Sequence, residues 1–266
     1  TSISKTNAHL TPKAIREALT RYSTFSYTTG QDLSELSLQD LGAIKDPDAN
    51  EAVTTETIAQ AGKDLTIALG GDNSITYAVG LGVFGDELAT AGLITLDAHH
   101  DLRDGISNGS PVRRLIQAGL DPKRIVQIGI NDFSNSASYA QLASDLGITV
   151  ISREMVAEIG IKETCNIALN VAGSAQGPIH VDLDVDVCDR SVVPACPAAA
   201  PDTWLSHCVT DRSSATAFAP TTRGPSIRMN LCSPDRIRGC SRHGRGCHPG
   251  YGKQQADEAL AQPAPR

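Results

Sequence analysis

Two short runs of this 266-residue chain combine the residue types that bind divalent cations. Asp97, His99 and Asp101 alternate along the first run, so on an extended backbone their side chains point to one side. Asp184 and Asp186 repeat the alternation later in the chain. Carboxylate and imidazole ligands suit a hard or borderline ion, Mn²⁺ in particular. Because five ligands exceed the need of one ion, we expect two ions that share a bridging carboxylate and hold a hydroxide between them.

Either run alone is a weak signal, because an isolated Asp-x-Asp is most often a solvated turn. Together they favour a metal site, since each run follows an apolar segment typical of a buried strand. A buried group of unpaired carboxylates would be very unstable without a cation. We interpret His100, inside the first run, as a supporting or packing residue rather than a proton shuttle.

Apolar runs typical of strands buried on both faces recur through the first 200 residues. The five predicted strands cover residues 65–69, 92–96, 124–129, 148–151 and 178–183. Segments with a helical pattern lie between them, and helices are also predicted near residues 13–19 and 51–61. This alternation predicts an α/β fold with a parallel sheet covered by helices on both faces. The carboxyl ends of parallel strands share one edge, so the polar segments after the strands should meet there.

Three segments, in this order, resemble the metal motifs of the arginase/agmatinase/formimidoylglutamase family of ureohydrolases: Gly-Gly-Asp-Asn-Ser at 70–74, Asp-Ala-His-His-Asp-Leu-Arg at 97–103 and Asp-Val-Asp-Val-Cys-Asp at 184–189. Asn-Gly-Ser-Pro-Val-Arg at 108–113 resembles the family's His-Gly-Thr/Ser-Pro segment. The resemblance covers about residues 11–200, and the sequence of this part is most similar to bacterial formimidoylglutamase-like members. It implies a three-layer arginase-like α/β fold with a central, mostly parallel sheet, two Mn²⁺ per chain and a homo-oligomer, a trimer or hexamer.

The resemblance also implies the metal ligands. Asp97 and Asp184 would bridge the two ions, and Asp101 would bind one of them. His99 and Asp186 would bind the other ion. This ligand set carries the family's roles position by position onto residues that the spacing already singles out.

Three of the departures from the family's pattern bear on the metal site and the substrate. Asn73 stands where a metal-binding His is common, so its carbonyl oxygen would be a neutral, weaker ligand and one site should be looser. Asn108 stands where some members have a His that relays protons or contacts substrate. Asp182 falls where a small polar residue is usual and could support Asp184 or compete with it as a ligand.

The expected reaction is hydrolysis of a linear amidine C–N bond. A hydroxide between two cations would attack the amidine carbon, and Asp101 would take the proton of that hydroxide and pass it to the leaving nitrogen. His99 is the second predicted catalytic residue. Formimidoylglutamate, converted to glutamate and formamide, is the leading substrate. Its carboxylates need a cation, for which Arg113 or Arg114 is a candidate. The predicted substrate-binding residues are Asn108, Arg113 and Asn131.

Two alternatives stay open. One is an agmatinase- or arginase-type hydrolase that acts on a guanidino compound. The other is a catalytically weakened metal-binding relative, which Asn73 favours.

Composition and charge indicate the kind of partner and the cellular location to expect. The net charge of −7 argues against a nucleic-acid partner, and no apolar run approaches the roughly 18 residues of a membrane span. No export signal is visible, so we expect a cytoplasmic enzyme of histidine metabolism with reduced cysteines and a small-molecule substrate.

The composition changes abruptly near residue 200. Net charge goes from −11 over residues 1–200 to +4 over residues 201–266, and Leu, Ile, Val and Phe make up only 7 of the last 66 residues. We therefore expect an arginase-like catalytic domain over residues 1–200, with the family's first strand missing ahead of Thr1. Residues 201–266 are expected to be a disordered or frame-shifted tail without strands or helices. Its cysteines lack the paired spacing of a zinc site.

Overall fold

Six parallel strands form the main sheet of the computed structural model, in the order β3-β8-β7-β4-β5-β6. The structure describes residues 2–3, 6–61 and 65–200, and the backbone of residues 227–232, all within one unit that spans residues 1–236. The strands are β3 (Ile67–Leu69), β4 (Gly92–Leu96), β5 (Ile125–Ile130), β6 (Thr149–Ser152), β7 (Ile179–Asp184) and β8 (Ile227–Cys232). The five strands predicted between residues 65 and 183 are thereby confirmed, as is the parallel sheet.

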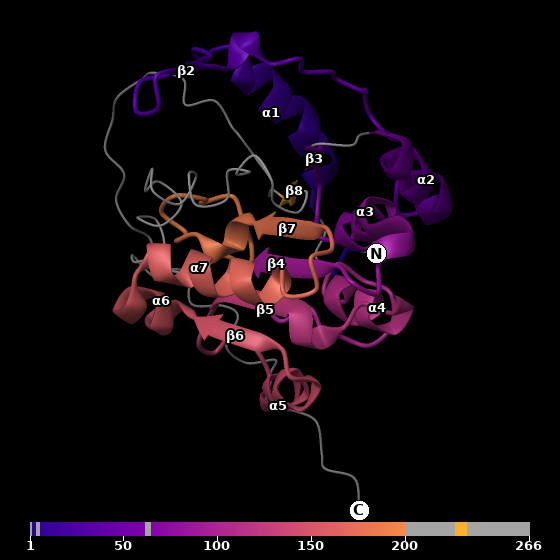
Figure 1. Ribbon diagram of the computed structural model, residues 1–266, viewed down its shortest axis with the longest axis vertical. Helices are drawn as coiled ribbons and strands as arrows, with labels where there is room; N and C mark the ends of the chain where they lie inside the picture. Colours follow the sequence, from indigo (N-terminus) through magenta and orange to yellow (C-terminus); the bar gives the residue numbers. More distant parts are fainter. Residues whose placement is uncertain (1, 4–5, 62–64, 201–226, 233–266) are drawn as a thin grey trace, which may run out of the picture. The chain divides into compact units, whose positions relative to one another are not determined.

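Helices cover both faces of this sheet (Figure 1). They are α1 (Thr11–Leu19), α2 (Glu51–Ala61), α3 (Ile75–Phe84), α4 (Pro111–Ala118), α5 (Ala137–Leu146), α6 (Arg153–Ile159) and α7 (Ile161–Ala172). The helical pattern over residues 153–172 is divided into α6 and α7 by Gly160, which has a φ of +80°. A short antiparallel pair, β1 (Phe25–Ser26) and β2 (Gln31–Asp32), lies outside the main sheet.

The strands place alternate residues into two apolar cores. Ile94 and Val126 pack with α6 and α7 on one face, whereas Leu93 and Ile125 pack with α2, α3, α4 and α5 on the other. Because side chains alternate across a strand, a strand buried on both faces is apolar at nearly every position. This explains why continuous apolar runs, rather than alternating ones, mark the strands in the sequence.

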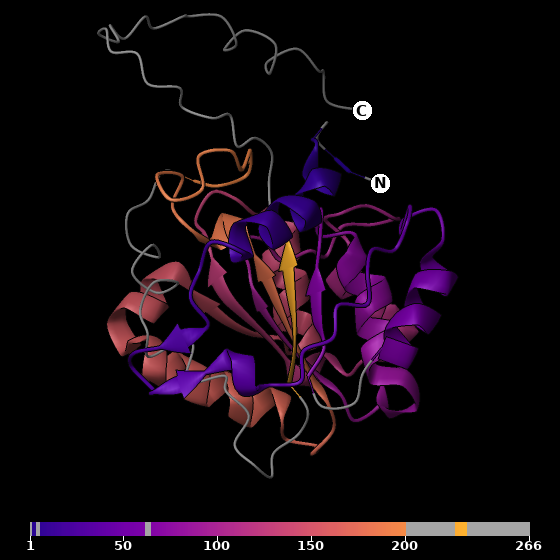
Figure 2. The same ribbon diagram turned by 90° about the horizontal axis from the view of Figure 1, so that it is seen from above.

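The expectation that residues 201–266 contain no strand is wrong. β8 lies between β3 and β7 and pairs with both (yellow in Figure 2). Its sequence, Ile-Arg-Met-Asn-Leu-Cys, alternates apolar and polar residues, but six residues are diluted in a composition averaged over 66. Residues 201–226 and 233–266 lie outside the described residues, and with them Cys240 and Cys247, two of the three cysteines weighed for zinc.

Within the described ranges, every helix is too short or too polar to cross a membrane. All six strands of the main sheet run in the same direction, so their carboxyl ends lie along one edge. The loops that leave β3, β4 and β7 at this edge contain the three predicted motifs.

Candidate metal centre

Strand pairing brings two of the motifs side by side. β4 pairs with β7 in parallel, with Leu96 opposite Leu183, so the next residues, Asp97 just after β4 and Asp184 at the end of β7, are neighbours at the edge of the sheet. The chain after β7 turns at once into a short 3₁₀ helix, Val185–Val187, which contains Asp186. The register of the sheet therefore accounts for the meeting of two segments that lie more than 80 residues apart.

Asp97, His99 and Asp186 form a compact group. One potential ligand atom from each lies within 4.8 Å of the others. His99 Nδ1 is 3.3 Å from Asp97 Oδ1 and 3.0 Å from Asp186 Oδ2. Both carboxylates are buried, while the His99 side chain is 30 % exposed. The group thus has one accessible side, and its donor set of two carboxylates and an imidazole fits Mn²⁺.

In each of three carboxylates, one oxygen accepts a hydrogen bond from a backbone N–H group. The N–H of His99 donates to Asp97 Oδ1 at 2.7 Å, and the N–H of Ala98 donates to Asp186 Oδ1 at 3.0 Å. The N–H of Asp186 donates to Asp184 Oδ1, also at 3.0 Å. These bonds orient the carboxylates before any ligand binds, which limits the rearrangement that a cation would require.

Asn73 joins the cluster from the loop after β3. Its Nδ2 donates to Asp101 Oδ2 and lies 3.4 Å from Asp97 Oδ2. Asp101 is buried and has a positive φ of 52°, a conformation that is uncommon for residues other than Gly. Since the amide nitrogen faces the carboxylates, the predicted ligand role of Asn73 requires its side-chain amide to turn over.

Burial and mutual repulsion perturb the acids of this cluster. Burial and the charge of Asp186 raise the pKa of Asp97 to about 6. Burial and the charges of Asp97 and Asp184 raise the pKa of Asp101 well above its usual range. Burial and the charges of Asp186 and Asp97 do the same for the pKa of Asp184. The site therefore has more negative charge than its surroundings can stabilise, which is the condition that a cation relieves.

His99 supplies positive charge to the cluster in the protein without metal. Burial would lower the pKa of His99, but hydrogen bonds to Asp186 and Asp97, and the charges of both, raise it to about 11. Burial likewise opposes ionisation of Asp186, whose pKa is nevertheless lowered by the hydrogen bond and charge of His99. A divalent cation would replace the imidazolium proton with a larger positive charge.

The two predicted arginines have different surroundings. Arg113 pairs with the exposed Asp104, with Nη2 2.6 Å from Oδ1, and its backbone N–H donates to the carbonyl oxygen of Asp101. Arg114 is held by Glu51 through two bonds of 2.7 Å and lies 3.7 Å over the ring of Tyr77. Arg114 thus ties helices together, whereas Arg113 lies beside the cluster with a partner that a substrate could replace.

The other two predicted substrate residues lie in neighbouring loops. Asn108 Oδ1 accepts a bond of 3.0 Å from the backbone N–H of Ile3. Asn131 follows β5 and donates its backbone N–H to the carbonyl oxygen of Ala98, within the 97–101 loop. Its Nδ2 donates to Ser134 Oγ. Asn131 is therefore anchored next to the metal ligands, while Asn108 is engaged by the N-terminal segment.

Supporting residues that sequence analysis missed hold the 98–100 segment in place. Gln127, fully buried in β5, lies with Oε1 2.7 Å from His100 Nδ1 and donates from Nε2 to the His100 carbonyl oxygen. Asn135 Oδ1 accepts the His100 N–H, and its Nδ2 donates to the Ala98 carbonyl oxygen. A polar residue in the middle of the apolar run 125–130 is the signal that could have identified Gln127.

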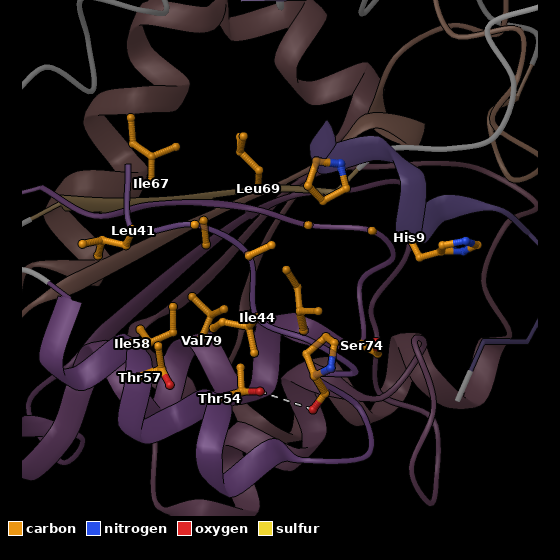
Figure 3. Close-up of a pocket in the computed structure, with 18 of the residues that line it drawn as sticks. His9, Leu41, Ile44, Thr54, Thr57, Ile58, Ile67, Leu69, Ser74 and Val79 are labelled. Carbon is orange, nitrogen blue, oxygen red and sulfur yellow. Dashed lines mark hydrogen bonds between the residues drawn. The ribbon is translucent and has the colours of Figure 1, made fainter. Parts of the chain in front are cut away.

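A pocket of about 750 Å³ is lined by residues of the 70–74 loop, α2, α3 and the 39–49 segment (Figure 3). Its walls are mainly apolar, and Ile44, Ile58, Val79 and Leu69 all line it. Asp72 and Ser74 belong to this lining, but none of the six predicted metal ligands does. This pocket is therefore separate from the carboxylate cluster, although the two share a loop.

Comparison with known proteins reveals relatives over most of the chain. The family model described as "Arginase family" matches residues 1–207. The formimidoylglutamase of Halalkalibacterium halodurans is 36 % identical over 213 residues, which cover 75 % of this chain and 66 % of that protein. The formimidoylglutamase of Bacillus subtilis is 33 % identical over 214 residues, with the same two coverages. The chain thus spans just under two thirds of the length of these curated relatives.

Solved structures share the fold. The crystal structure of formimidoylglutamase from Bacillus subtilis superposes with a TM-score of 0.77 and 28 % identity, and covers 88 % of this chain and 75 % of that one. The structure of Trypanosoma cruzi formiminoglutamase with Mn²⁺ superposes with a TM-score of 0.71 over 87 % of this chain and 79 % of that one. At 22 % identity, the second comparison supports the three-layer fold alone.

Proposed function

Because this chain belongs to the arginase family, we propose that it hydrolyses a C–N bond of a linear amidine, with formimidoylglutamate converted to glutamate and formamide as the leading reaction. The observation that carries this proposal is the buried group of Asp97, His99 and Asp186, which follows strands β4 and β7 and has one accessible side. Similarity to two formimidoylglutamases supports the choice of substrate.

The proposed cofactor is Mn²⁺, with two ions per chain. Asp97, His99 and Asp186 would hold the ions together with Asp101 and Asp184, whose pKa values are raised by burial and by neighbouring carboxylates, an effect that a cation would offset. When bound, the ions supply Lewis acidity and make water a competent nucleophile at neutral pH.

The side chains of this protein would then position the substrate and transfer protons. Asp101 is buried in the cluster, and its carboxylate would take the proton of the attacking water and return it to the leaving nitrogen. His99 lies on the accessible side, where the amidine carbon must approach. Oxygen from water is added to that carbon, the bond to the glutamate nitrogen breaks, and this nitrogen receives the proton.

Arg113 is the proposed partner of a substrate carboxylate. Its pair with Asp104 is largely exposed, since Asp104 is 83 % accessible, and exposed ion pairs contribute only about 0–1 kcal/mol. A substrate carboxylate can therefore replace Asp104 with little loss of stability. Asn108 and Asn131 are proposed to contact the rest of the substrate from the adjoining loops.

We further propose a homo-oligomeric, cytoplasmic enzyme of histidine breakdown. An agmatinase- or arginase-type activity is the alternative within the family. A metal-binding relative with weak catalysis is favoured by one observation, the amide nitrogen of Asn73 that faces Asp97 and Asp101.

Metal content and turnover, measured on the same preparations, test this proposal. The wild-type chain is expected to retain about two Mn²⁺ after dialysis and to release formamide from formimidoylglutamate. His99→Ala should lose bound metal and at least 100-fold of the activity, on the order of the loss for metal-site changes. His9→Ala, an exposed residue of the separate pocket, is the matched control and should change neither.

The outcomes separate the three readings. Turnover of agmatine or arginine in place of formimidoylglutamate would identify the guanidino alternative. Bound Mn²⁺ without turnover of any of these substrates would identify a binding protein. A wild-type chain that binds no Mn²⁺ would contradict the metal centre itself.

A further inference from the structure

Asn73, Thr76 and Asp182 form a buried polar chain behind the carboxylate cluster. Thr76, in the first turn of α3, is fully buried, and the other two are 5 % and 2 % exposed. The Thr76 hydroxyl oxygen lies 2.7 Å from Asn73 Oδ1 and 2.8 Å from Asp182 Oδ2. Asp182 comes from β7, 106 residues after Thr76, so this row of hydrogen-bonded side chains depends on the packing of α3 against the sheet.

The Thr76 hydroxyl faces two acceptors but has one proton to donate. When the proton goes to Asn73 Oδ1, the amide nitrogen of Asn73 faces Asp101 and Asp97, as in this structure. When the proton goes to Asp182, the Thr76 oxygen can accept a bond from Asn73 Nδ2 instead. The Asn73 carbonyl oxygen would then face the cluster, and every donor in the chain would again have an acceptor.

The two orientations suit two different occupants of the cluster. An N–H group stabilises neighbouring carboxylates, because they are acceptors. A carbonyl oxygen repels them but is a good ligand for a hard cation such as Mn²⁺. The oxygen and nitrogen ends of an amide have nearly the same shape, so the side chain can turn over within the same buried space.

We propose that Thr76 and Asp182 are positioning residues that turn the Asn73 carbonyl oxygen toward the metal site. This inference deepens the proposed function and rests on it, since the cation is the one proposed there. In this orientation Asn73 Nδ2 donates a hydrogen bond to Thr76 Oγ1, and the Thr76 hydroxyl donates one to Asp182 Oδ2. We call these two bonds the relay, and they leave the Asn73 carbonyl oxygen free to bind the metal. Without this relay, the amide keeps its nitrogen toward Asp101 and Asp97 and the site binds metal less tightly.

Manganese affinity of the full chain, measured by equilibrium dialysis with metal analysis, tests the relay without relying on turnover. Thr76→Val removes the hydroxyl at nearly constant volume and should weaken the binding of one Mn²⁺ by about tenfold, the lower end of the effect of losing an outer partner of a metal ligand. Thr76→Ser keeps the hydroxyl and should retain wild-type affinity. Circular dichroism checks that each variant is folded, and Thr76→Ala against Thr76→Ser gives the same comparison if the valine variant is not.

A double-mutant cycle separates orientation from packing. Thr76→Val should have no effect on Mn²⁺ affinity when Asn73 is already alanine, because no amide remains to be oriented. Equal affinities of wild type and Thr76→Val would overturn this inference alone, as would the same tenfold loss in the Asn73→Ala background. A wild-type chain without Mn²⁺ binding would overturn the proposed function, and the relay with it.

Discussion

The protonation of His99 couples metal binding to pH. Its hydrogen bonds to Asp186 and Asp97 outweigh burial and raise the pKa of His99 to about 11, so the imidazole has its proton at pH 7 in the metal-free protein. A metal can bind the imidazole only after this proton leaves. Affinity for Mn²⁺ should therefore rise at least about tenfold per pH unit between pH 6.5 and 8.5, because His99 alone releases one proton and the raised pKa values of Asp101 and Asp184 can only add to this release.

Calorimetric titration in buffers of different ionisation enthalpy measures this proton release. Below pH 6 the slope should steepen, because Asp97, with a pKa of about 6, then also has to lose a proton. His99→Ala provides the control, since any metal that it still binds should release no proton from this position. Affinity that stays constant from pH 6.5 to 8.5 would contradict the assignment of His99 as a ligand.

At the level of single residues, the sequence predicts identities better than orientations. The alternation of Asp97, His99 and Asp101 identifies candidate ligands, because it depends only on neighbouring positions. The orientation of the Asn73 amide depends on Thr76 and Asp182, and the second of these comes from another strand. No local pattern contains that information.

Close packing of α2 against α3 predicts the effect of a single methyl group. A Cβ on Gly82 would lie 2.5 Å from the Thr55 carbonyl oxygen and 2.7 Å from Ile58 Cβ, and the first is backbone that cannot move without its helix. Overpacking costs about 1–3 kcal/mol or more, against a gain of about 1 kcal/mol in helix propensity. Gly82→Ala should therefore lower the free energy of unfolding by about 2 kcal/mol, as measured by urea denaturation.

Gly80→Ala in the same helix is the matched control. A Cβ there would lie 3.0 Å from Leu115 Cδ2, the end of a side chain that can rotate away. We expect this variant to stay within about 1 kcal/mol of wild type, because the helix-propensity gain offsets the small shift of Leu115. If both variants unfold at the same urea concentration, backbone contact between α2 and α3 is not what requires glycine at position 82.

At the level of elements, apolar runs predict β4, β5 and β7 because these central strands are buried on both faces, and such runs also mark β3 and β6, which are only partly buried. β8 was missed because composition was averaged over a long segment. Its six residues lie inside a segment whose average composition is that of a disordered chain. Only pairing with β7 and β3 shows that this segment belongs to the sheet. A composition average can therefore conceal a central strand, whereas periodicity over six residues would have indicated it.

At the level of the whole molecule, β8 connects two parts of the sheet. It pairs over six positions with β7 and over three with β3, and among the described strands it is the neighbour that joins β3 to the rest of the main sheet. β3 leads directly into the loop of Asn73, so the position of that residue over Asp101 depends on where β3 is held. The integrity of the metal site should thus depend on residues far beyond its last ligand.

Two truncations test this dependence. A chain that ends at residue 236 keeps β8 and the whole unit of residues 1–236, and should unfold cooperatively in urea and bind Mn²⁺ like the full chain. A chain that ends at residue 226 keeps all six predicted ligands but lacks β8, so β3 loses its pairing and Asn73 its fixed place. This shorter chain should show a smaller denaturant slope, because less surface is buried, and a Mn²⁺ affinity lowered at least tenfold. If it matches the longer truncation in both measurements, β8 is not required to hold β3 and the site together.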